Sequence, residues 1–539
     1  MATINASLHD AITYYQCGGV DLLKSLSPSV VRLDVLLLRT LVAVAVVALS
    51  LCFLPTTWAT IAQKHRIASA LRSLPGPPGL PLLGNLIQLG QHMHDLHLWK
   101  RHLATVYGST YAIRVDLVMN GSIVTNKPCN IEHILSTNCS NYVKPQIIQD
   151  VCKEVMGQSI FAINPDSPLW ACQRKLMANM FSVNSFRKYM DSVFVDAADA
   201  ALGRLDAAAR RNDTVNLETT LLTLTTTIAF RIGFGRHVPE AMTTDAFHGL
   251  FREAGAITAN RFTRPWYKFA GAVLPSEARL RTVVGEIDAA LYALIAERKA
   301  APVTPSAVDV LSQLLDQQRR GLLELSDTVV RDTMMTVLLA GRETVASGLL
   351  WILYCVSRHP AVEAKLLAEV DGVSSVDYES MSSLVYMEAV MKETWRLFPP
   401  TPLELKAAVA DDVLPDGTFV PAGVNVEFSP FVMNRDPTRW RNPDAFEPER
   451  WLEPGFSPTD FEYPVFNAGK RKCVGQRIAM LQTKFILCKL YRHLRFDMLD
   501  EKDPTFALGI SLFPTNGMAV KPVLRRPSST LSTTPAPAA

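Results

Sequence analysis

The segment FNAGKRKCVGQRIAMLQTKF at Phe466–Phe485 decides how the rest of this 539-residue chain is interpreted. Its cysteine, Cys473, follows a loop with glycine and arginine and directly precedes a helical pattern. A helix start lowers the pKa of a thiol, and we expect Arg471 and the nearby lysines to help. Gly469 and Gly475 let the backbone approach a flat ligand closely. The spacing F-x-x-G-x-R-x-C-x-G is therefore hard to explain as the surroundings of an inert buried cysteine.

A second signal lies in a long predicted helix from Ser326 to Arg358, which begins at a capping serine and stops before Pro360. The sequence AGRET occupies positions 340–344, in the middle of this helix. Glycine in a helix interior costs about 1 kcal/mol relative to alanine, which indicates a packing or functional reason. Taken alone, the motif is equally compatible with a solvated acid beside a helix threonine.

Two further motifs are weak by themselves. Glu393 and Arg396 are three residues apart, so they share one helix face and can pair. Most such pairs are solvated surface charges. Trp170 and Arg174 form a W-x-x-x-R pattern, although a tryptophan on a helix usually belongs to the core.

Together these motifs resemble those of a known family. The segment at 466–485 resembles the haem-binding signature of the cytochrome P450 family, and the other three motifs agree with it. The resemblance implies that Cys473 is the axial thiolate ligand of the haem iron. It also implies that haem propionates bind Trp170, Arg174 and Arg471. The remaining cofactor contacts that it implies are Phe466, Gly469, Gly475, Ala340 and Gly341.

The resemblance also assigns catalytic and structural roles. Thr344 is expected to hydrogen-bond dioxygen at the iron, and Glu343 is expected to relay protons. Glu393 and Arg396 are expected to bond with Arg450 of the segment FEPERW, in a buried network that supports the cysteine loop.

The implied fold is mainly α with small β-sheets: one large haem domain at 86–524 plus an N-terminal transmembrane helix. Residues 40–63 contain no charge and are long enough to cross a bilayer, which predicts the anchor. We expect an N-terminal extension at 1–39 before it and a proline-rich hinge at 64–85 after it. The polar, proline-rich residues 525–539 are predicted to be a disordered tail.

Composition agrees with a large apolar protein. Hydrophobic residues make up 48% of the chain, which excludes a disordered protein. The net charge of +3 argues against a nucleic-acid partner bound through a broad basic surface. The nine cysteines include no C-x-x-C pair, a pattern typical of a reducing compartment.

The expected activity is that of a membrane-bound haem-thiolate monooxygenase, which inserts one oxygen atom from dioxygen into a C–H bond of a lipophilic substrate. The AGRET and FNAG sequences and DDVLPDGTFVPAG at 411–423 look most similar to the fatty-acid ω-hydroxylase clan of plants and fungi. One alternative is a sterol or other secondary-metabolite hydroxylase. Another, from a different class, is a non-catalytic haem protein that binds small ligands, although the pair Glu343 and Thr344 speaks against it.

The resemblance implies haem b as cofactor and electrons from NADPH through a separate reductase, since the chain has no dinucleotide fingerprint or flavin module. The expected partner is NADPH–cytochrome P450 reductase, with cytochrome b5 as a second donor. We expect Lys470, Lys472 and Arg477 to attract its acidic surface. The resemblance alone implies a single-pass protein of the endoplasmic reticulum with its catalytic domain in the cytosol.

Overall fold

The computed structural model describes residues 62–525, apart from 82, 116–120, 181–182, 236–244, 263–266, 272, 302–308, 322–324, 500–503 and 508. The chain divides into two compact units, Met1–Arg66 and Ile67–Ala539, and the second is described below. Of the anchor expected at 40–63, all but residues 62 and 63 lie outside the described chain, as do the N-terminal extension and residues 526–539.

Helices make up most of the second unit, as the resemblance implied. The α-helices are α4 (Leu86–Gln91), α5 (Leu96–Tyr107), α6 (Pro128–Glu132), α7 (Gln146–Met156), α8 (Pro168–Met180), α9 (Val183–Lys188), α10 (Val195–Arg211), α11 (Leu217–Phe234), α12 (Asp245–Asn260), α13 (Tyr267–Ala270), α14 (Pro275–Ala300), α15 (Val310–Arg319), α16 (Asp327–Arg358), α17 (Pro360–Asp371), α18 (Val385–Leu397), α19 (Pro430–Met433) and α20 (Gln476–His493). Short 3-10 or π turns are η1 (His133–Thr137), η2 (Cys139–Asn141), η3 (Tyr189–Phe194), η5 (Ser380–Ser382), η6 (Pro448–Leu452), η7 (Pro464–Phe466) and η8 (Gly469–Arg471).

The strands are short and form small sheets. They are β1 (Thr110–Ile113), β2 (Ser122–Thr125), β3 (Tyr142–Val143), β4 (Val215–Asn216), β5 (Glu404–Ala408), β6 (Asp412–Val413), β7 (Phe419–Val420), β8 (Asn425–Phe428), β9 (Leu494–Met498), β10 (Phe506–Ala507), β11 (Phe513–Pro514) and β12 (Ala519–Leu524). The largest sheet has the order β1-β2-β8-β5-β3, in which only β2 and β8 are parallel. A three-stranded sheet has the order β4-β12-β9, and β6–β7 and β10–β11 are separate pairs.

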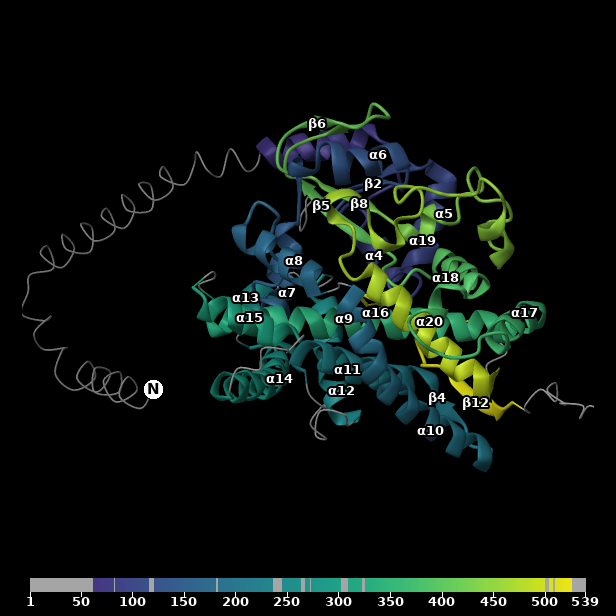
Figure 1. The fold of residues 1–539 in the computed structure, drawn as a ribbon. Coiled ribbons are helices and arrows are strands. Elements are labelled where there is room, and N and C mark those ends of the chain that lie inside the picture. The colour runs from purple at the N-terminus through teal and green to yellow at the C-terminus, as the bar shows by residue number, and fades with distance from the viewer. Residues whose placement is uncertain are drawn as a thin grey trace, which may run out of the picture. The chain divides into compact units, whose positions relative to one another are not determined.

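Helix α16 lies between the large sheet and the helices α11, α12 and α14 (Figure 1). Its bounds agree with the prediction: Ser326 caps its start by accepting the N–H of Val329 at 3.3 Å, and the chain turns at His359 before Pro360. Among the described helices it alone has the length and apolarity of a membrane span, and 67% of its most apolar window is buried within the protein. That burial identifies it as the central core helix.

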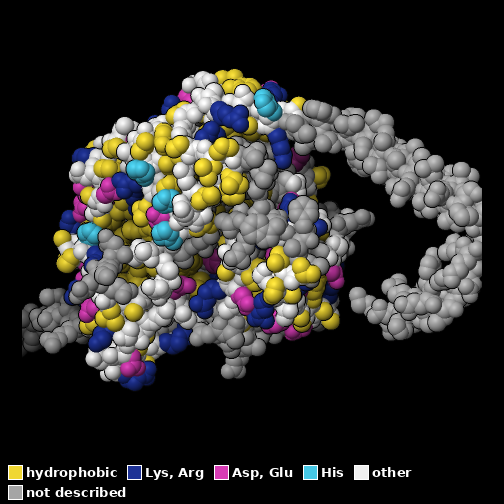
Figure 2. Space-filling view, turned by 180° about the vertical axis from the view of Figure 1, so that it is seen from behind, with side chains coloured by type: hydrophobic (Ala, Val, Ile, Leu, Met, Phe, Trp, Pro, Cys, Tyr) yellow, Lys and Arg dark blue, Asp and Glu magenta, His cyan; other side chains and the backbone are white. Residues whose placement is uncertain are grey.

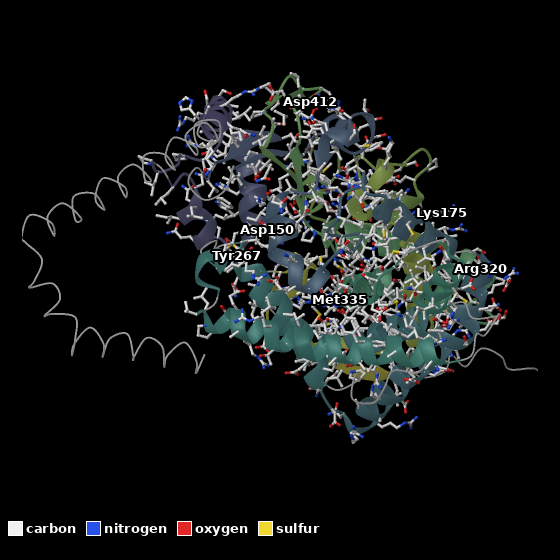
Figure 3. All side chains as sticks on the ribbon, turned by 90° about the vertical axis from the view of Figure 1, so that its left-hand side faces the viewer. Asp150, Lys175, Tyr267, Arg320, Met335 and Asp412 are labelled. Carbon is white, nitrogen blue, oxygen red and sulfur yellow. The ribbon has the colours of Figure 1, made fainter. Side chains whose placement is uncertain are left out.

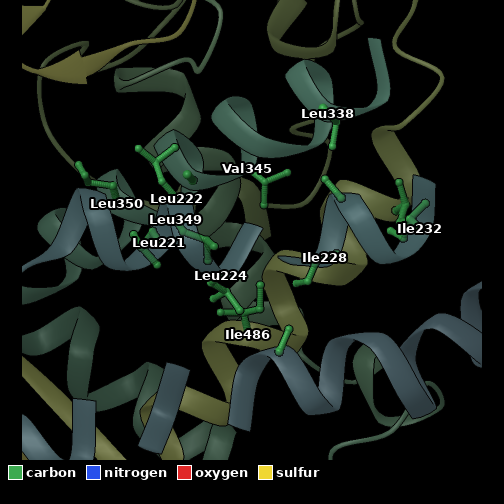
Figure 4. Close-up of a cluster of buried hydrophobic side chains, with 14 of the residues drawn as sticks. Leu221, Leu222, Leu224, Ile228, Ile232, Leu338, Val345, Leu349, Leu350 and Ile486 are labelled. Carbon is green, nitrogen blue, oxygen red and sulfur yellow. The ribbon is translucent and has the colours of Figure 1, made fainter. Parts of the chain in front are cut away.

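The main core forms where α11, α16 and α20 meet (Figure 4). Leu224 and Ile228 of α11, Leu349 of α16 and Ile486 of α20 are each at most 1% exposed. Helix α11 begins at Asn216, whose side chain accepts the N–H of Thr219 at 3.1 Å. Local capping therefore sets the helix ends, and burial of a continuous apolar face holds the helices together.

Ion pairs join α7 to the segment from α12 to α14. Arg261 donates to Glu154 at 2.6 Å and to Glu277 at 2.5 Å, and its guanidinium lies 4.6 Å from the ring centre of Tyr267. Asp150 of α7 pairs with Lys268 of α13, and Figure 3 shows Asp150 and Tyr267 close together. These contacts fix the position of α7, which directly follows β3.

The hinge expected at 64–85 is attached to the sheet over its second half. The carbonyl of Pro75 accepts the N–H of Ala112 in β1 at 2.8 Å, and a Cβ on Gly76 would lie 2.3 Å from the carbonyl oxygen of Ala112. The Asn85 side chain donates to the carbonyls of Pro77 and Pro78. The proline-rich segment is therefore an ordered part of the domain surface.

Charges of both signs are interspersed on the face in Figure 2, with apolar side chains between them.

The core packing generates a stability prediction. Truncating Leu349 to alanine should lower the free energy of unfolding by about 2–5 kcal/mol, because it leaves a cavity between α11 and α16. Leu98→Ala is the matched control, since Leu98 is 48% exposed, and should cost less than about 0.5 kcal/mol. Urea titrations of both variants, prepared with equal cofactor content, measure the difference; equal midpoints would contradict the assignment of Leu349 to the core.

Candidate functional site

The cysteine loop is shaped by its own backbone. It leaves η7 at Phe466 and returns so that the Cys473 N–H donates to the Phe466 carbonyl at 2.8 Å. Gly469 has a φ of +56°, and a Cβ there would lie 2.5 Å from the carbonyl oxygen of Leu135. Glycine is thus required at 469 by both conformation and space. Gly475 has an ordinary φ, and a Cβ there would lie 3.8 Å from the Cys473 sulfur.

The thiol of Cys473 lies just before α20, with an accessible side chain that protein atoms nevertheless surround closely. Burial raises its pKa. The backbone N–H groups of Gly475 and Gln476 lower it, as does the positive charge of Arg174, but burial has the larger effect. The helix start therefore acts on the thiol in the expected direction, while the positive charge beside the sulfur comes from Arg174. A bound metal ion is the kind of charge that deprotonates such a thiol.

Positive side chains from distant segments gather beside this loop. Arg174 of α8 donates to the Lys472 carbonyl at 2.8 Å and lies 5.2 Å from the ring centre of Trp170. Arg471 donates to the Tyr142 carbonyl at 3.0 Å. Burial lowers the pKa of both arginines. The positive charge of Arg174 also lowers the pKa of Arg471.

Two lysines that the sequence did not single out join this group. Lys144, just after β3, donates to the Ile160 carbonyl at 3.0 Å, and burial lowers its pKa to about 7. The charges of Lys406 and Arg471 lower that pKa further, while Glu404 opposes them. Four cations beside only two carboxylates, Glu404 and Asp166, indicate a site for a ligand with anionic groups. The propionates of a haem fit this site.

The middle of α16 is more accessible than the turns that follow it. Ala340, Gly341, Glu343 and Thr344 are half-buried, whereas all residues from 345 to 356 are buried. A Cβ on Gly341 would lie 3.4 Å from the Cβ of Ala229, so glycine permits the close approach of α11. A flat ligand lying against the open stretch fits the small side chains at 340 and 341.

The two expected catalytic side chains lie in this open stretch. Thr344 Oγ1 donates to the Ala340 carbonyl at 2.7 Å. Glu343 accepts from Arg342 Nη1 at 2.9 Å. Burial raises the pKa of Glu343, and Arg342 partly offsets this effect. A carboxyl group whose pKa is raised by burial suits proton transfer.

Trp395 connects this helix to the cysteine loop. Its ring packs edge-on against Phe466 with centroids 5.6 Å apart. On its other side a Cβ on Gly348, one turn after Thr344, would lie 2.8 Å from the indole nitrogen. Sequence reasoning missed Gly348 because a glycine in a helix does not reveal which distant side chain occupies the space.

Behind the loop, Glu393 is the centre of a buried network. Arg396 donates to both of its oxygens at 2.9 Å, and Arg450 donates to one of them at 3.0 Å. The indole of Trp451 and the backbone N–H of Glu447 also donate to Glu393, each at 2.9 Å. The three charged side chains are at most 2% exposed. The arrangement joins α18 to the segment that leads into the cysteine loop.

This network generates the second prediction. Glu393→Gln should lower the free energy of unfolding by about 3–5 kcal/mol, because two buried arginines lose their counter-charge. Glu388→Gln, also in α18, is the control: Glu388 pairs with Lys392 and Lys484 at 2.7 Å but is 35% exposed, so about 1 kcal/mol or less is expected. Denaturant titration measures both, and equal losses would contradict a special role for Glu393.

Comparison with known proteins gives the family. The sequence profile described as Cytochrome P450 matches residues 74–521. The chain is 28% identical to Cytochrome P450 94A2 of Vicia sativa over 495 residues, which cover 87% of this chain and 95% of the relative. It is 30% identical to Cytochrome P450 94B3 of Arabidopsis thaliana over 470 residues, covering 83% and 91%. It is 26% identical to Cytochrome P450 704B1 of Arabidopsis thaliana over 529 residues, covering 88% and 99%.

The profile match covers the described domain from the hinge to β12 and includes the cysteine loop, the open stretch of α16 and the Glu393 network. Membership of the matched family makes haem the cofactor and an electron-supplying reductase the class of partner. This chain belongs to the cytochrome P450 family of haem-thiolate monooxygenases.

Proposed function

We propose that this enzyme hydroxylates fatty acids at or near their ω end. The supporting observation is the AGRET sequence, whose acid and threonine lie in the open stretch of α16, together with the FNAG start of the cysteine loop. Both features look similar to the fatty-acid ω-hydroxylase clan. The plant relatives of the 94 and 704 series agree with that assignment.

In this proposal the sulfur of Cys473 would hold the haem iron. When bound, the haem would supply the iron chemistry that activates dioxygen. Trp170, Arg174 and Arg471 hold the propionates, and Lys144 and Lys406 add positive charge beside them. Phe466, Gly469 and Gly475 shape the loop around the sulfur.

On the other side, the side chains of α16 handle substrate and protons. Ala340 and Gly341 leave room for a flat ligand and for the end of an acyl chain. Thr344 can turn its hydroxyl away from the Ala340 carbonyl to hydrogen-bond a reacting group. Glu343 holds a proton because burial raises its pKa, and it releases that proton when a stronger base forms nearby.

A groove of about 560 Å³ on the cysteine side suits the reductase. It is lined by residues of α18, α20 and the segment before the loop, including Lys392, Asp460 and Arg477. Lys470 and Arg477 are exposed, whereas Lys472 pairs with Asp460 at 2.7 Å. Electrostatic attraction of an acidic partner therefore depends chiefly on Lys470 and Arg477 in this proposal.

We further propose a single membrane span at residues 40–63, in the endoplasmic reticulum, with the catalytic domain in the cytosol. The uncharged length of that segment supports a span. An NADPH–cytochrome P450 reductase, with cytochrome b5 as a second electron donor, fits that location.

Product analysis tests the proposed substrate. Purified full-length enzyme, mixed with NADPH–cytochrome P450 reductase and NADPH, should convert lauric acid and oleic acid to hydroxy acids with the hydroxyl near the ω end. Cys473→Ser should abolish the product and the red-shifted Soret band of the reduced carbon monoxide complex. Turnover of a sterol but not of either acid would overturn the fatty-acid assignment, and absence of any turnover with an intact band would favour a ligand-binding protein.

Reductase docking can be tested at low ionic strength. The double variant Lys470→Glu/Arg477→Glu should raise the reductase KM about tenfold without changing kcat, because two attractive charges become repulsive. Arg319→Glu, an exposed charge of α15 outside the groove, is the control. A KM equal to that of the control would contradict the docking site.

The cations beside the loop predict a pH effect on cofactor retention. Before an anion binds, the pKa of Lys144 is about 7, and a propionate beside it would raise that pKa. Cofactor binding then takes up a proton above about pH 7 and weakens as the pH rises. Transfer of haem to excess apomyoglobin should accelerate over that range. Lys144→Met should transfer faster and with less pH dependence, unlike the exposed control Lys153→Met; identical pH profiles would refute the role of Lys144.

A further inference from the structure

The hairpin formed by residues 411–423 carries a carboxylate whose bonds lead away from the hairpin. Asp412 lies in β6, and Figure 3 shows it at the upper edge of the domain. Its Oδ2 accepts from Tyr142 OH at 2.7 Å, from His133 Nε2 at 2.8 Å and from Asn138 Nδ2 at 3.0 Å. Three side chains therefore converge on one oxygen atom, although the nearest of them is 270 residues away in the chain.

These bonds keep the groups in defined protonation states. Burial raises the pKa of Asp412, but the three side-chain bonds outweigh burial and hold that pKa below its usual value. Burial and the bond to Asp412 raise the pKa of Tyr142, so its hydroxyl keeps its proton and donates. Because a carboxylate only accepts, His133 carries a proton on Nε2. The result is an ionised acceptor that reaches the fully buried Tyr142 from the rim of the domain.

The strand that contains Tyr142 has few bonds of its own. β3 has two residues and pairs with β5 only at Tyr142 with Ala408 and Val143 with Ala407. A strand this short makes few ladder hydrogen bonds. The bond from the Tyr142 hydroxyl to Asp412 therefore adds an anchor that the sheet does not supply.

The same stretch of chain supports the cysteine loop. Arg471 Nη2 donates to the backbone carbonyl of Tyr142 at 3.0 Å, so Asp412 anchors the residue on which Arg471 rests. The η1 turn, held by the same carboxylate, contains Leu135, whose carbonyl oxygen would lie 2.5 Å from a Cβ on Gly469. Direct contacts thus lead from Asp412 through Tyr142 to the guanidinium of Arg471.

We propose that Asp412 is a positioning residue for the cofactor: it holds Tyr142, whose carbonyl sets the guanidinium of Arg471 toward an anionic group of the bound haem. The inference rests on the proposed function, in which Arg471 holds a propionate. Asp412 acts only through Tyr142 and does not touch the cofactor. The hairpin thereby controls cofactor retention although it lies outside the cysteine loop.

A second carboxylate of the hairpin provides a matched control. The side chain of Asp416 is 6% exposed and pairs with Lys127, the residue before α6, at 3.2 Å. It also accepts from Thr110 Oγ1 of β1 at 2.8 Å and from the N–H of Thr418 at 3.1 Å. Asp416→Asn therefore changes a comparably bonded carboxylate whose partners belong to β1, the start of α6 and the hairpin.

The test is retention of haem, measured as transfer from full-length enzyme to excess apomyoglobin at fixed pH. Asp412→Asn should accelerate the transfer about tenfold, because a neutral amide replaces an ionised acceptor. Asp416→Asn should lower the urea midpoint as much as Asp412→Asn does, but should change the transfer rate less than about twofold. Asp412→Glu keeps the charge and should restore part of the retention. Freshly prepared enzyme of each variant should show the red-shifted Soret band of the reduced carbon monoxide complex, because Cys473 is unchanged.

A double-mutant cycle separates positioning from a general loss of stability. In an Arg471→Gln background, Asp412→Asn should accelerate transfer only about threefold or less, because residues that act through one another are not additive. Equal factors in the two backgrounds would overturn the proposal. Tyr142→Phe deletes only the hydroxyl that reaches Asp412 and should also accelerate transfer, which decides the question if Asp412→Asn does not fold. A transfer rate for Tyr142→Phe equal to that of the unaltered enzyme would likewise overturn the proposal.

Arg471→Gln alone distinguishes this inference from the proposed function. If Arg471→Gln leaves haem transfer unchanged, the role of Arg471 as a propionate ligand is wrong. If Arg471→Gln accelerates transfer while Asp412→Asn behaves like Asp416→Asn, the propionate site stands and positioning by Asp412 is refuted.

Discussion

The carboxylate of Glu393 is the contact on which the site depends. It accepts bonds from two arginines, an indole and a backbone N–H, and all of these donors except Arg396 of its own helix belong to the segment that continues toward the cysteine loop. An ion buried so completely is stable only when every lone pair has a partner. The segment 441–453 is irregular, so these bonds replace the ladder hydrogen bonds that a strand or helix would have. The position of the cysteine loop, which follows this segment, therefore depends on the side chain of Glu393.

Charge and burial oppose each other throughout the site. Burial raises the pKa of the thiol and of the proton-handling carboxyl group, and it lowers the pKa of the cations beside the loop. Each shift disfavours the charged form. A cofactor with a metal ion and two carboxylates would offset these costs in one event, because its metal would pair with the sulfur and its anions with the cations beside the loop. The domain is thus electrostatically complementary to the whole cofactor.

Local signals in the sequence were enough to predict the elements that have local causes. The capping Ser326 and the stop at Pro360 mark α16 correctly. The cysteine loop was recognisable because its shape depends on glycines and on a bond within the loop itself. The pairing of Glu393 with Arg450 needed the family resemblance, since 57 residues separate the two.

Features with distant causes could not be predicted. Lys144 and Lys406 come together because β3 pairs with β5, and no sequence pattern in either strand predicts that pairing. At Cys473 the arginine that acts on the sulfur is Arg174, almost 300 residues earlier in the chain, and no local pattern places it there. Tertiary placement decides both the sign of a pKa shift and the identity of the neighbouring charge.

The raised pKa of Cys473 also bears on unwanted chemistry at this accessible sulfur. Oxidants and disulfides attack the thiolate and react slowly with the thiol. The burial that shapes the loop therefore also protects its sulfur from oxidation.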